Sequence, residues 1–284
     1  MDTDHKQWSS SSHEAGVEKF YGVGVENYGE YHNGYLNFGL WENGNTDYLV
    51  AAENLIRTMG QMVGLNAQSR LLDVACGMGP QDVFIAKTFG CQIDAVDLTW
   101  KHVEHARRRA QEAGLTDAIT VHHGNATELP FADATFTQVQ CVEGAEHFNT
   151  REKFLKEAIR VLKPGGVIIL GDYTLKRQPK NVYEKSVVEA ARILWHVPKA
   201  NYETVESFGT TMERCGFKNV TVKTVGAETI PGYYFEARRP ENRKQQAKIR
   251  GWLTAKLAFF VDYSVYKAFK DGLIEYVLAR GEKA

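Results

Sequence analysis

Between residues 70 and 173 the sequence alternates short apolar runs, rich in Val and Ile, with longer segments that have helical periodicity. The apolar runs end in Gly or Asp, and we interpret them as buried strands. The helical segments end in Gly or Pro-Gly, which is typical of helix C-termini. Strands and helices that alternate in this way predict an α/β fold with a doubly wound parallel sheet. The predicted strands are 70–75, 92–98, 118–123, 136–142 and 166–173, and the predicted helices are 80–90, 100–114 and 151–163.

The helix predicted at 151–163 has the clearest boundaries. Asn149 is the expected N-cap, because Glu152 three residues later can act as its reciprocal partner in a capping box. Apolar residues then recur on one face of the helix, which predicts that this face is buried. The sequence "KPGG" at 163–166 is expected to end the helix.

The chain beyond the fifth predicted strand is less regular. Helical patterns at 176–200 and 236–271 are interrupted by a strand candidate at 217–225. The chain closes with another strand candidate at 273–283. Because there is no internal repeat and no long Gly/Ser linker, we expect a single elaborated domain.

Composition excludes several classes of function. The 284 residues have a formal net charge of −1, with basic residues spread along the chain, so nucleic acid is a poor candidate partner. The four cysteines lie far apart, with no CxxC pair and no His at metal-ligand spacing, which argues against a zinc site or a disulfide framework. No apolar run approaches the roughly 20 residues of a membrane span, and the polar N-terminus is unlike a signal peptide. We therefore expect a cytoplasmic protein with no metal and no stable membrane association.

The run "LLDVACGMGP" at 71–80 joins the first predicted strand to the first predicted helix. Gly77 and Gly79 let the backbone approach a ligand beyond the carboxyl end of the strand, although they could instead form a plain tight turn. A dinucleotide fingerprint has a third glycine where Asp82 stands, and an acid there would repel pyrophosphate. Asp97, at the end of the second strand, has the spacing of a carboxylate that accepts hydrogen bonds from ribose. The ligand is therefore expected to be a nucleoside without a pyrophosphate.

Four segments, in the same order, resemble motifs of the class I S-adenosylmethionine-dependent methyltransferases. They are "LLDVACGMGP", "AVDLTWKHVEHARRRAQEAGL", "GNATELPF" and "FLKEAIRVLKPGGVIIL", and they cover about residues 60–173. The resemblance implies a Rossmann-like seven-stranded sheet whose last strand is antiparallel. It also implies that S-adenosyl-L-methionine is the cofactor.

The resemblance further implies which residues contact the cofactor. The family more often has Asp where Asn125 stands, but an Asn can still accept a hydrogen bond through its carbonyl. The implied contacts are Asp73, Gly77 and Gly79 at the methionine moiety, Asp97 at the ribose, Leu98 on the adenine, Asn125 and Ala126 beside its amino group, Val142, and Tyr21 or Tyr28 near the carboxylate.

The end of the fourth predicted strand, "QCVEGAEHF", lacks the Pro-Pro-aromatic motif of enzymes that methylate nucleobase amines. The stretch "VEGAEHF" instead resembles the small-molecule group, which includes sugar O-, sterol and tocopherol C-, and fatty-acid O-methyltransferases. Glu143 and His147 would lie at the carboxyl edge of the sheet, where the transferred methyl group should point. His147 is the candidate base, and Glu143 or Glu146 would orient its imidazole or anchor the substrate. The alternative is that His147 is solvated and merely precedes the cap at Asn149.

Aromatic residues concentrate in two other parts of the chain. Those near the N-terminus form either a mobile lid over the site or part of the core: Tyr21, Tyr28, Tyr31, Tyr35, Phe38 and Trp41. Those in later segments should cover the acceptor pocket, which indicates a bulky, largely apolar acceptor. The basic run at 238–250 is either a solvated helix face or a contact for an acidic substrate. The residues expected to contact the acceptor are Trp41, Trp195, Tyr233, Tyr234, Phe235 and Tyr263, with Trp252, Phe259 and Phe260 in the same cover.

These segments give an expected domain organisation. Residues 46–284 would form the methyltransferase domain, with helical cap segments at about 176–202 and 232–270 over the acceptor pocket. Residues 1–45 would form an N-terminal helical flap, and about the first 14 of them are expected to be disordered.

The sequence therefore favours a methyltransferase that acts on a small molecule. Oxygen is the favoured acceptor atom, because a positioned His helps most with a hydroxyl or carboxyl acceptor, while carbon and nitrogen remain open. One rival is an NAD-dependent oxidoreductase on the same architecture, which would need a pyrophosphate to tolerate Asp82. Another rival is a non-catalytic subunit that retains the fold. The oligomeric state stays open, a homodimer included.

Overall fold

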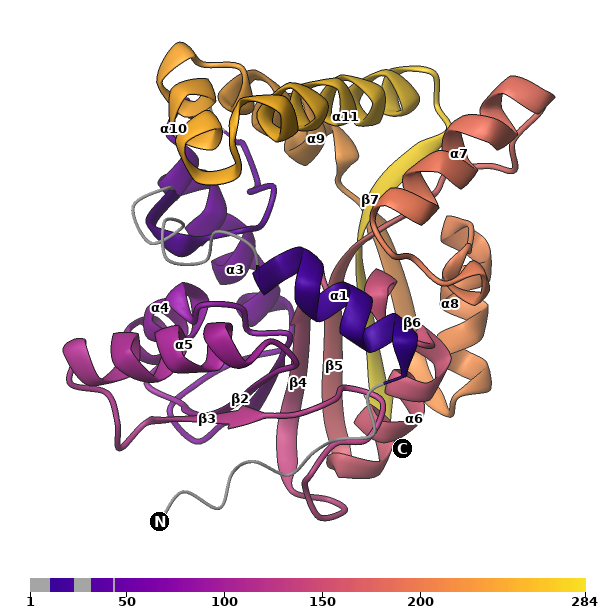
Figure 1. Cartoon of the computed structure of the whole chain (residues 1–284). Helices are drawn as coiled ribbons and strands as arrows, with labels where there is room; N and C mark the ends of the chain where they lie inside the picture. Colours follow the sequence, from indigo (N-terminus) through magenta and orange to yellow (C-terminus); the bar gives the residue numbers. More distant parts are fainter. Residues whose placement is uncertain (1–10, 23–31, 43) are drawn as a thin grey trace.

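The computed structural model describes residues 11–22, 32–42 and 44–284 of the chain. A seven-stranded sheet runs through its centre in the order β3-β2-β1-β4-β5-β7-β6 (Figure 1). β7 is antiparallel to its neighbours β5 and β6, whereas the other paired strands are parallel. This confirms the predicted doubly wound sheet with an antiparallel last strand. The strands are β1 Arg70–Val74, β2 Gln92–Asp97, β3 Ile119–His123, β4 Phe136–Val142, β5 Leu162–Leu175, β6 Phe217–Thr224 and β7 Ile274–Lys283.

Helices cover both faces of the sheet, because alternate strand residues point to opposite sides. In β1, Leu71 packs into the core beneath α3, α4 and α5, whereas Leu72 and Val74 pack into the core beneath α6 and α8. Both faces are apolar, as expected for a mostly parallel sheet. The α-helices are α1 Ser12–Gly22, α3 Tyr48–Met62, α4 Pro80–Phe89, α5 Trp100–Glu112, α6 Arg151–Val161, α7 Val182–Leu194, α8 Val205–Arg214, α9 Gly226–Ala237, α10 Pro240–Arg250 and α11 Trp252–Lys270, and the 3-10 helices are η1 His32–Gly34, η2 Ala145–His147 and η3 Lys199–Asn201.

The start of α6 differs from the prediction. Thr150, which has extended backbone angles, caps the helix through its side-chain oxygen. Glu152, the expected reciprocal partner of the cap, pairs instead with Lys156 and Arg214. The predicted capping box at Asn149 is therefore wrong, because the hydroxyl that reaches the free N–H groups is one residue further along the chain.

α1 and the cap helices α9, α10 and α11 lie at the end of the sheet where the parallel strands finish (Figure 1). Ser12 and Glu14 belong to the first turn of α1, whereas the first ten residues lie outside the described ones. Within the described ranges, none of the helices combines the length and the apolar character that crossing a bilayer requires. All four cysteines are free thiols.

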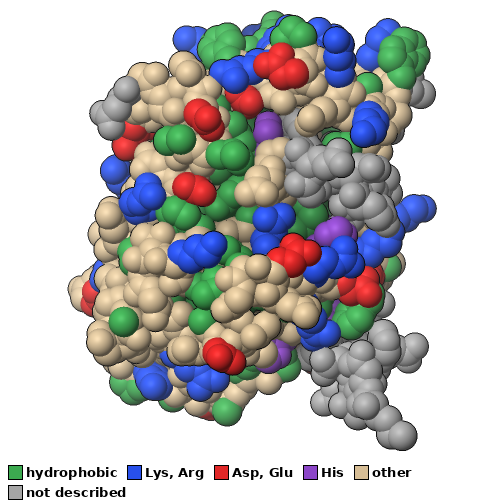
Figure 2. All heavy atoms as spheres, turned by 90° about the vertical axis from the view of Figure 1, so that its left-hand side faces the viewer, with side chains coloured by type: hydrophobic (Ala, Val, Ile, Leu, Met, Phe, Trp, Pro, Cys, Tyr) green, Lys and Arg blue, Asp and Glu red, His purple; other side chains and the backbone are tan. Residues whose placement is uncertain are grey.

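Charged side chains of both signs are mixed on the face that Figure 2 shows, which is the left-hand side of Figure 1. Lys and Arg side chains lie among Asp and Glu side chains there. This mixture agrees with the net charge of −1, and it gives this face no uniform field that would attract a polyanion.

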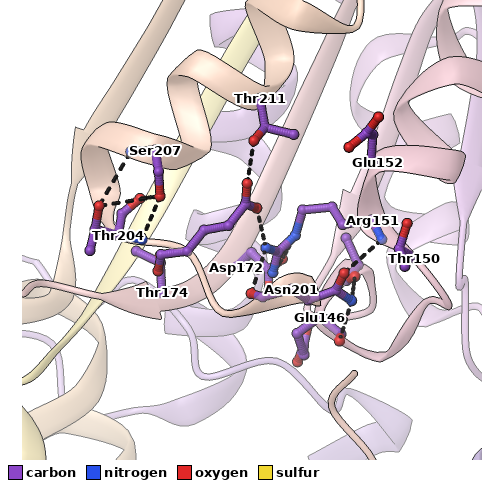
Figure 3. Close-up of polar contacts among 12 residues, drawn as sticks. Glu146, Thr150, Arg151, Glu152, Asp172, Thr174, Asn201, Thr204, Ser207 and Thr211 are labelled. Carbon is purple, nitrogen blue, oxygen red and sulfur yellow. Dashed lines mark hydrogen bonds and ion pairs between the residues drawn. The ribbon is translucent and has the colours of Figure 1, made fainter. Parts of the chain in front are cut away.

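Arg151 is the largest fully buried side chain among the described residues, and it lies in a polar network beside the sheet (Figure 3). Its guanidinium donates to Asp172 at 2.8 and 3.2 Å, to Glu203 at 2.8 Å and to the backbone oxygen of Asn201 at 3.1 Å. Burial and the neighbouring Glu146 carboxyl raise the pKa of Asp172 well above its usual value. The Asp172 and Glu146 carboxyls are hydrogen-bonded to each other, which requires one of them to hold a proton.

Asn201 joins this network to η2, the short helix that follows β4 (Figure 3). Its amide nitrogen donates to the backbone oxygens of Glu146 at 2.8 Å and Phe148 at 2.7 Å. Its amide oxygen accepts from the backbone N–H of Arg151 at 2.9 Å. Because these groups are buried, breaking any of the bonds would leave an unpaired polar atom. The network therefore fixes η2, which includes His147, relative to β5 and α6.

We expect Arg151→Ala to lower the free energy of unfolding by about 3–5 kcal/mol, because Asp172 and Glu203 would stay buried without their cation. Lys156→Ala is the matched control: it removes an exposed pair with Glu152 and should leave stability nearly unchanged. Urea unfolding at pH 7, followed by circular dichroism, measures both. Equal stability of the two variants would show that the buried network contributes nothing.

Candidate active site

A pocket of about 380 Å³ lies at the carboxyl ends of β1, β2 and β4. It is lined by the turn after β1, the end of β2 and the turn after β4, together with side chains from α1, α7, α10 and α11. Open α/β sheets bind their ligands at this edge, and the volume lies in the range of small-molecule sites. The position of the pocket agrees with the position predicted for the ligand.

The turn after β1 has the left-handed backbone that its glycines predict. Gly77 and Gly79 have φ angles of 57° and 75°. Gly77 lines the pocket, and its backbone N–H donates to the carboxylate of Asp97 at 2.9 Å. A Cβ at Gly79 would lie 2.9 Å from the Cβ of Ala106, so this glycine allows α5 to pack against the turn. The structure therefore places Gly77 in the pocket and Gly79 outside its lining.

Asp97, at the end of β2, keeps a negative charge in this part of the pocket. Its carboxylate accepts from the backbone N–H groups of Gly77 at 2.9 Å and Thr99 at 2.8 Å, and it lies 3.3 Å from Nδ1 of His102. Burial by itself raises the pKa of Asp97, but His102 and the N–H donors outweigh burial and hold the pKa below its usual value. The ionised carboxylate can accept further hydrogen bonds from a ligand.

Asp73 and Asp82 lie behind the turn, outside the pocket lining. Asp73 accepts from the side-chain amides of Gln81 at 3.2 Å and Gln140 at 3.3 Å. Burial raises the pKa of Asp73 to about 6, and burial together with Asp73 raises the pKa of Asp82 well above its usual value. The carboxyl of Asp82 thus interacts with Asp73 and does not face the pocket. The repulsion of a pyrophosphate by Asp82 stays a prediction.

The residues predicted on the adenine side lie together in the pocket lining, where Leu98, Ala126 and Val142 contribute apolar surface. The side-chain oxygen of Asn125 accepts from both the backbone N–H and the hydroxyl of Thr127, each at 2.9 Å. An amide oxygen has two lone pairs, so the oxygen of Asn125 can accept from an adenine amino group when the Thr127 hydroxyl turns away. The expected acceptance through its carbonyl stays a prediction, and the amide nitrogen, which takes no part in these two bonds, is a second group for a ligand.

His147 lines the pocket and is 7% exposed, so the alternative of a solvated imidazole is wrong. Its Nδ1 lies 2.7 Å from the backbone oxygen of Trp195, and because a carbonyl only accepts, Nδ1 holds the hydrogen. Nε2 of the neutral ring then accepts from the hydroxyl of Tyr21 at 2.7 Å. Burial lowers the pKa of His147 to about 4, so the ring is neutral at pH 7. His147 can therefore accept a proton at neutral pH.

Glu143 lines the same pocket, but its carboxyl makes no hydrogen bond to the imidazole of His147 among those the structure shows. One carboxyl oxygen accepts from the backbone N–H of Phe38 at 2.8 Å and from the hydroxyl of Tyr276 at 2.9 Å. Burial raises the pKa of Glu143 to about 8, so the carboxyl is mostly protonated at pH 7 and can donate a hydrogen bond. Glu146 is the carboxyl beside the ring, with Oε1 3.4 Å from Nε2 of His147.

Aromatic rings form the apolar part of the pocket beside Glu143. The ring of Phe38 stacks on Tyr233 at 4.0 Å between centroids and meets Tyr173 edge-on at 4.9 Å. Tyr173 in turn lies 6.4 Å from Trp195. Two of the residues predicted to contact the acceptor, Trp195 and Tyr233, therefore lie in the lining.

The other four residues predicted to contact the acceptor lie outside the lining. Trp41 packs against α9, and Tyr234 stacks on Tyr266 of α11 at 4.2 Å. Phe235 and Tyr263 are 61% and 44% exposed on the outer surface. Contact of these four residues with an acceptor stays a prediction, and for those on α9 and α11 helical periodicity does not say which face turns inward.

The described N-terminal aromatics lie in the core or in the pocket lining, and their role as a mobile lid stays a prediction. Tyr35 is buried in the core, and Tyr21, Tyr35 and Phe38 line the pocket. Tyr28 and Tyr31 lie outside the described residues, so the expectation of a cofactor contact at Tyr28 stays a prediction.

The basic run at 238–250 falls mainly on α10. Gln246 and Ile249 of this helix line the pocket, whereas the exposed cations Arg243 and Lys244 do not. This arrangement agrees with a solvated basic face rather than a contact for an acidic substrate.

Tyr173 and Asn201 belong to the site but were not singled out from the sequence. Tyr173 lines the pocket, and its hydroxyl is buried without a hydrogen-bond partner among the described residues. Tyr173 is the last residue of the predicted fifth strand, in "GDY", so the sequence already placed it at the carboxyl edge of the sheet, where the ligand was expected. No sequence pattern indicated Asn201, because its amide donates to backbone oxygens that lie more than 50 residues away in the sequence.

Comparison with known proteins agrees with this geometry. The methyltransferase-domain family matches residues 72–170. Erythromycin 3''-O-methyltransferase of Saccharopolyspora erythraea is 33% identical over 67% of this chain and 64% of its own length, so the match spans slightly less than two thirds of that relative. The 27-O-demethylrifamycin SV methyltransferase of Amycolatopsis mediterranei is 28% identical over 75% of this chain and 77% of its own length.

A solved structure shares the fold over almost the whole chain. The cyclase SpnF superimposes with a TM-score of 0.79, covers 96% of this chain and 97% of its own, and is 21% identical. At this identity the likeness shows the fold alone. The matched domain shows that the chain contains a methyltransferase domain, and the two relatives and the order of the motifs support the class I S-adenosylmethionine-dependent methyltransferases.

Proposed function

We propose that the protein transfers the methyl group of S-adenosyl-L-methionine to a hydroxyl oxygen of a bulky, largely apolar small molecule, with His147 as the proton acceptor. The proposal depends on one observation. A single pocket contains both the turn where Gly77 meets Asp97 and a neutral imidazole that can accept a proton.

The residues on the β1 and β2 side of the pocket fit the cofactor. The ionised carboxylate of Asp97 would accept hydrogen bonds from the ribose hydroxyls. The apolar wall of Leu98 and Val142 would pack on the adenine, and the amide nitrogen of Asn125 would donate to a ring nitrogen. When bound, the cofactor supplies a methyl group on a positively charged sulfur, whose carbon–sulfur bond breaks as the carbon–oxygen bond forms.

Proton removal from the acceptor uses Tyr21 and His147. The acceptor hydroxyl would donate to the oxygen of Tyr21, whose own hydrogen already points to Nε2 of His147. As the new carbon–oxygen bond forms, the acceptor proton would pass to Tyr21 and the proton of Tyr21 to Nε2. A base with a pKa of about 4 is weak, so we infer that most of the acceleration comes from alignment in a dry site, worth about 7–11 kcal/mol in well-oriented reactions.

The acceptor itself would lie among the rings of Phe38, Tyr173, Trp195 and Tyr233. These rings favour a large apolar molecule. The protonated carboxyl of Glu143 and the hydroxyl of Tyr173 would bind oxygen atoms of that molecule and so fix its orientation.

Two observations support oxygen as the acceptor atom. The names of the two relatives refer to oxygen positions, those of erythromycin and of a demethylrifamycin. A hydroxyl also has a proton to lose during the transfer, and Tyr21 and His147 form a hydrogen-bonded path for it.

Asp97→Asn should weaken the binding of S-adenosylhomocysteine about 100-fold or more, because the amide loses charge-assisted hydrogen bonds to the ribose. Asp94→Asn, in the same strand but outside the pocket lining, is the control and should bind normally. Calorimetry on folded protein measures both, and NAD should not bind. Binding of NAD but not of S-adenosylhomocysteine would overturn the proposal in favour of an oxidoreductase.

The acceptor can be found by incubating the protein with methyl-tritiated cofactor and a cell extract, and isolating the labelled compound. With that compound, His147→Gln and Tyr21→Phe should each lower the single-turnover rate, by about 100- to 10,000-fold for His147. His122→Gln, outside the pocket, is the control.

The pH dependence of the same reaction tests the role of His147. Because burial lowers the pKa of His147 to about 4, the imidazole is protonated only below that pH. The wild-type single-turnover rate should therefore rise through about pH 4 and should not change with this group from pH 6 to 8. An identical profile in His147→Gln would exclude His147 from the mechanism.

A further inference from the structure

The outward face of α11 has an unusual composition. Trp252 and Phe260 are each 66% exposed, and Tyr263 is 44% exposed, with exposed lysines between and after them. At about 100° per residue, all the exposed aromatic and lysine positions of the helix fall within an arc of about 80°. We call this set the α11 stripe: Trp252, Lys256, Phe260, Tyr263, Lys267 and Lys270.

The opposite face of α11 already covers the pocket and the core. Ala258, Val261 and Asp262 line the pocket, and Val265 is buried. A surface helix normally has its apolar residues on one face and polar residues on the other. The large aromatic residues of the α11 stripe therefore lie on the face that turns away from the core, where exposed large apolar side chains indicate a surface that binds something.

The start of α7 extends the patch. Val182 and Tyr183 are 80% and 67% exposed. Arg177 donates both to Glu184 in the first turn of α7 and to the backbone oxygen of Asp271, which directly follows α11, so this end of α7 is next to the end of α11. The patch therefore includes residues from two helices that also contribute to the pocket.

The charge of the patch is positive, although the whole chain has a net charge of −1. The α11 stripe contains no acidic residue. Lys256 lies over the ring of Trp252 at 4.0 Å, and Lys270 makes no ion pair among the described residues. Lys267 is paired, with Asp271. Figure 2 shows basic and hydrophobic side chains, with some acidic ones among them, along the upper edge of the molecule, the end where Figure 1 places α10 and α11.

We propose that the α11 stripe docks on the surface of a membrane that contains anionic lipid. Trp and Tyr rings favour the interface between headgroups and acyl chains, and lysines can extend their charge to the headgroups from an apolar surface. Anionic lipid complements the unpaired cations of the stripe. A second copy of this chain fits less well, because a two-fold contact would bring the lysines of both stripes together without acids to pair them.

Docking of this kind needs no membrane-spanning helix and is weak and reversible, so it is compatible with the expectation of no stable membrane association. It would also place the cover of the pocket, α7 and α11, against the lipid. Combined with the proposed function, it indicates an apolar acceptor that enters the pocket from the bilayer.

Co-sedimentation with vesicles tests the proposal on the full chain. The protein should bind phosphatidylcholine vesicles that contain about 30 mol% phosphatidylglycerol more tightly than pure phosphatidylcholine vesicles. Binding should fall when salt rises from about 0.1 to 0.5 M, because salt screens the lysines. Trp252→Ser with Phe260→Ser, and separately Lys256→Gln with Lys270→Gln, should each lower the partition coefficient about tenfold or more.

Val50→Ser on α3 and Lys163→Gln at the start of β5 are matched controls, because both residues are exposed outside the patch; they should bind as the wild type does. All variants should keep the wild-type affinity for S-adenosylhomocysteine, which separates this test from that of the proposed function. Equal binding to both kinds of vesicle, or wild-type binding by the Trp252 and Phe260 double variant, would overturn the proposal. So would a wild-type dimer that this double variant converts to a monomer in sedimentation velocity.

Discussion

β1 is hydrogen-bonded to β2 on one side and to β4 on the other, and all three strands are parallel. Their carboxyl ends therefore stop at one edge of the sheet, and the turns that follow them meet there. The bond from the N–H of Gly77 to the carboxylate of Asp97 joins two of these turns directly. The third turn includes His147 and is held by Arg151 and Asn201. The pocket exists because parallel pairing brings these three local structures together.

Burial decides the charge of most ionisable groups around this pocket. It lowers the pKa of His147 to about 4 and raises the pKa of Glu143 to about 8, so these two groups are mainly neutral at pH 7. Asp97 stays ionised, because His102 and two backbone N–H groups stabilise its carboxylate. A dry pocket of fixed polar groups needs little reorganisation when charge moves from a sulfonium to a proton acceptor, and this supports methyl transfer as the reaction.

The helices over the pocket have one face toward the pocket and one face on the outer surface of the molecule. The inner face of α11 covers the pocket with Val261, while its outer face exposes Trp252 and Phe260. Because α11 contributes to the pocket with one face and to the outer surface with the other, a shift of this helix would change the pocket and the outer surface together. An apolar pocket and an apolar, basic outer surface on the same helices are consistent with an acceptor that partitions into lipid.

The sequence by itself determined the strands, from runs of apolar residues, and the positions of Gly77 and Asp97, from their spacing along one strand–turn–helix–strand unit. It also placed His147 at the right edge of the sheet. Only the tertiary structure decided that the oxygen of Trp195, 48 residues away, fixes the Nδ1 hydrogen of His147. It also decided that Asp82 lies outside the pocket lining and which aromatic residues line the pocket. The reason is physical: periodicity and spacing are properties of neighbouring residues, whereas burial and hydrogen-bond partners depend on how distant segments pack against one another.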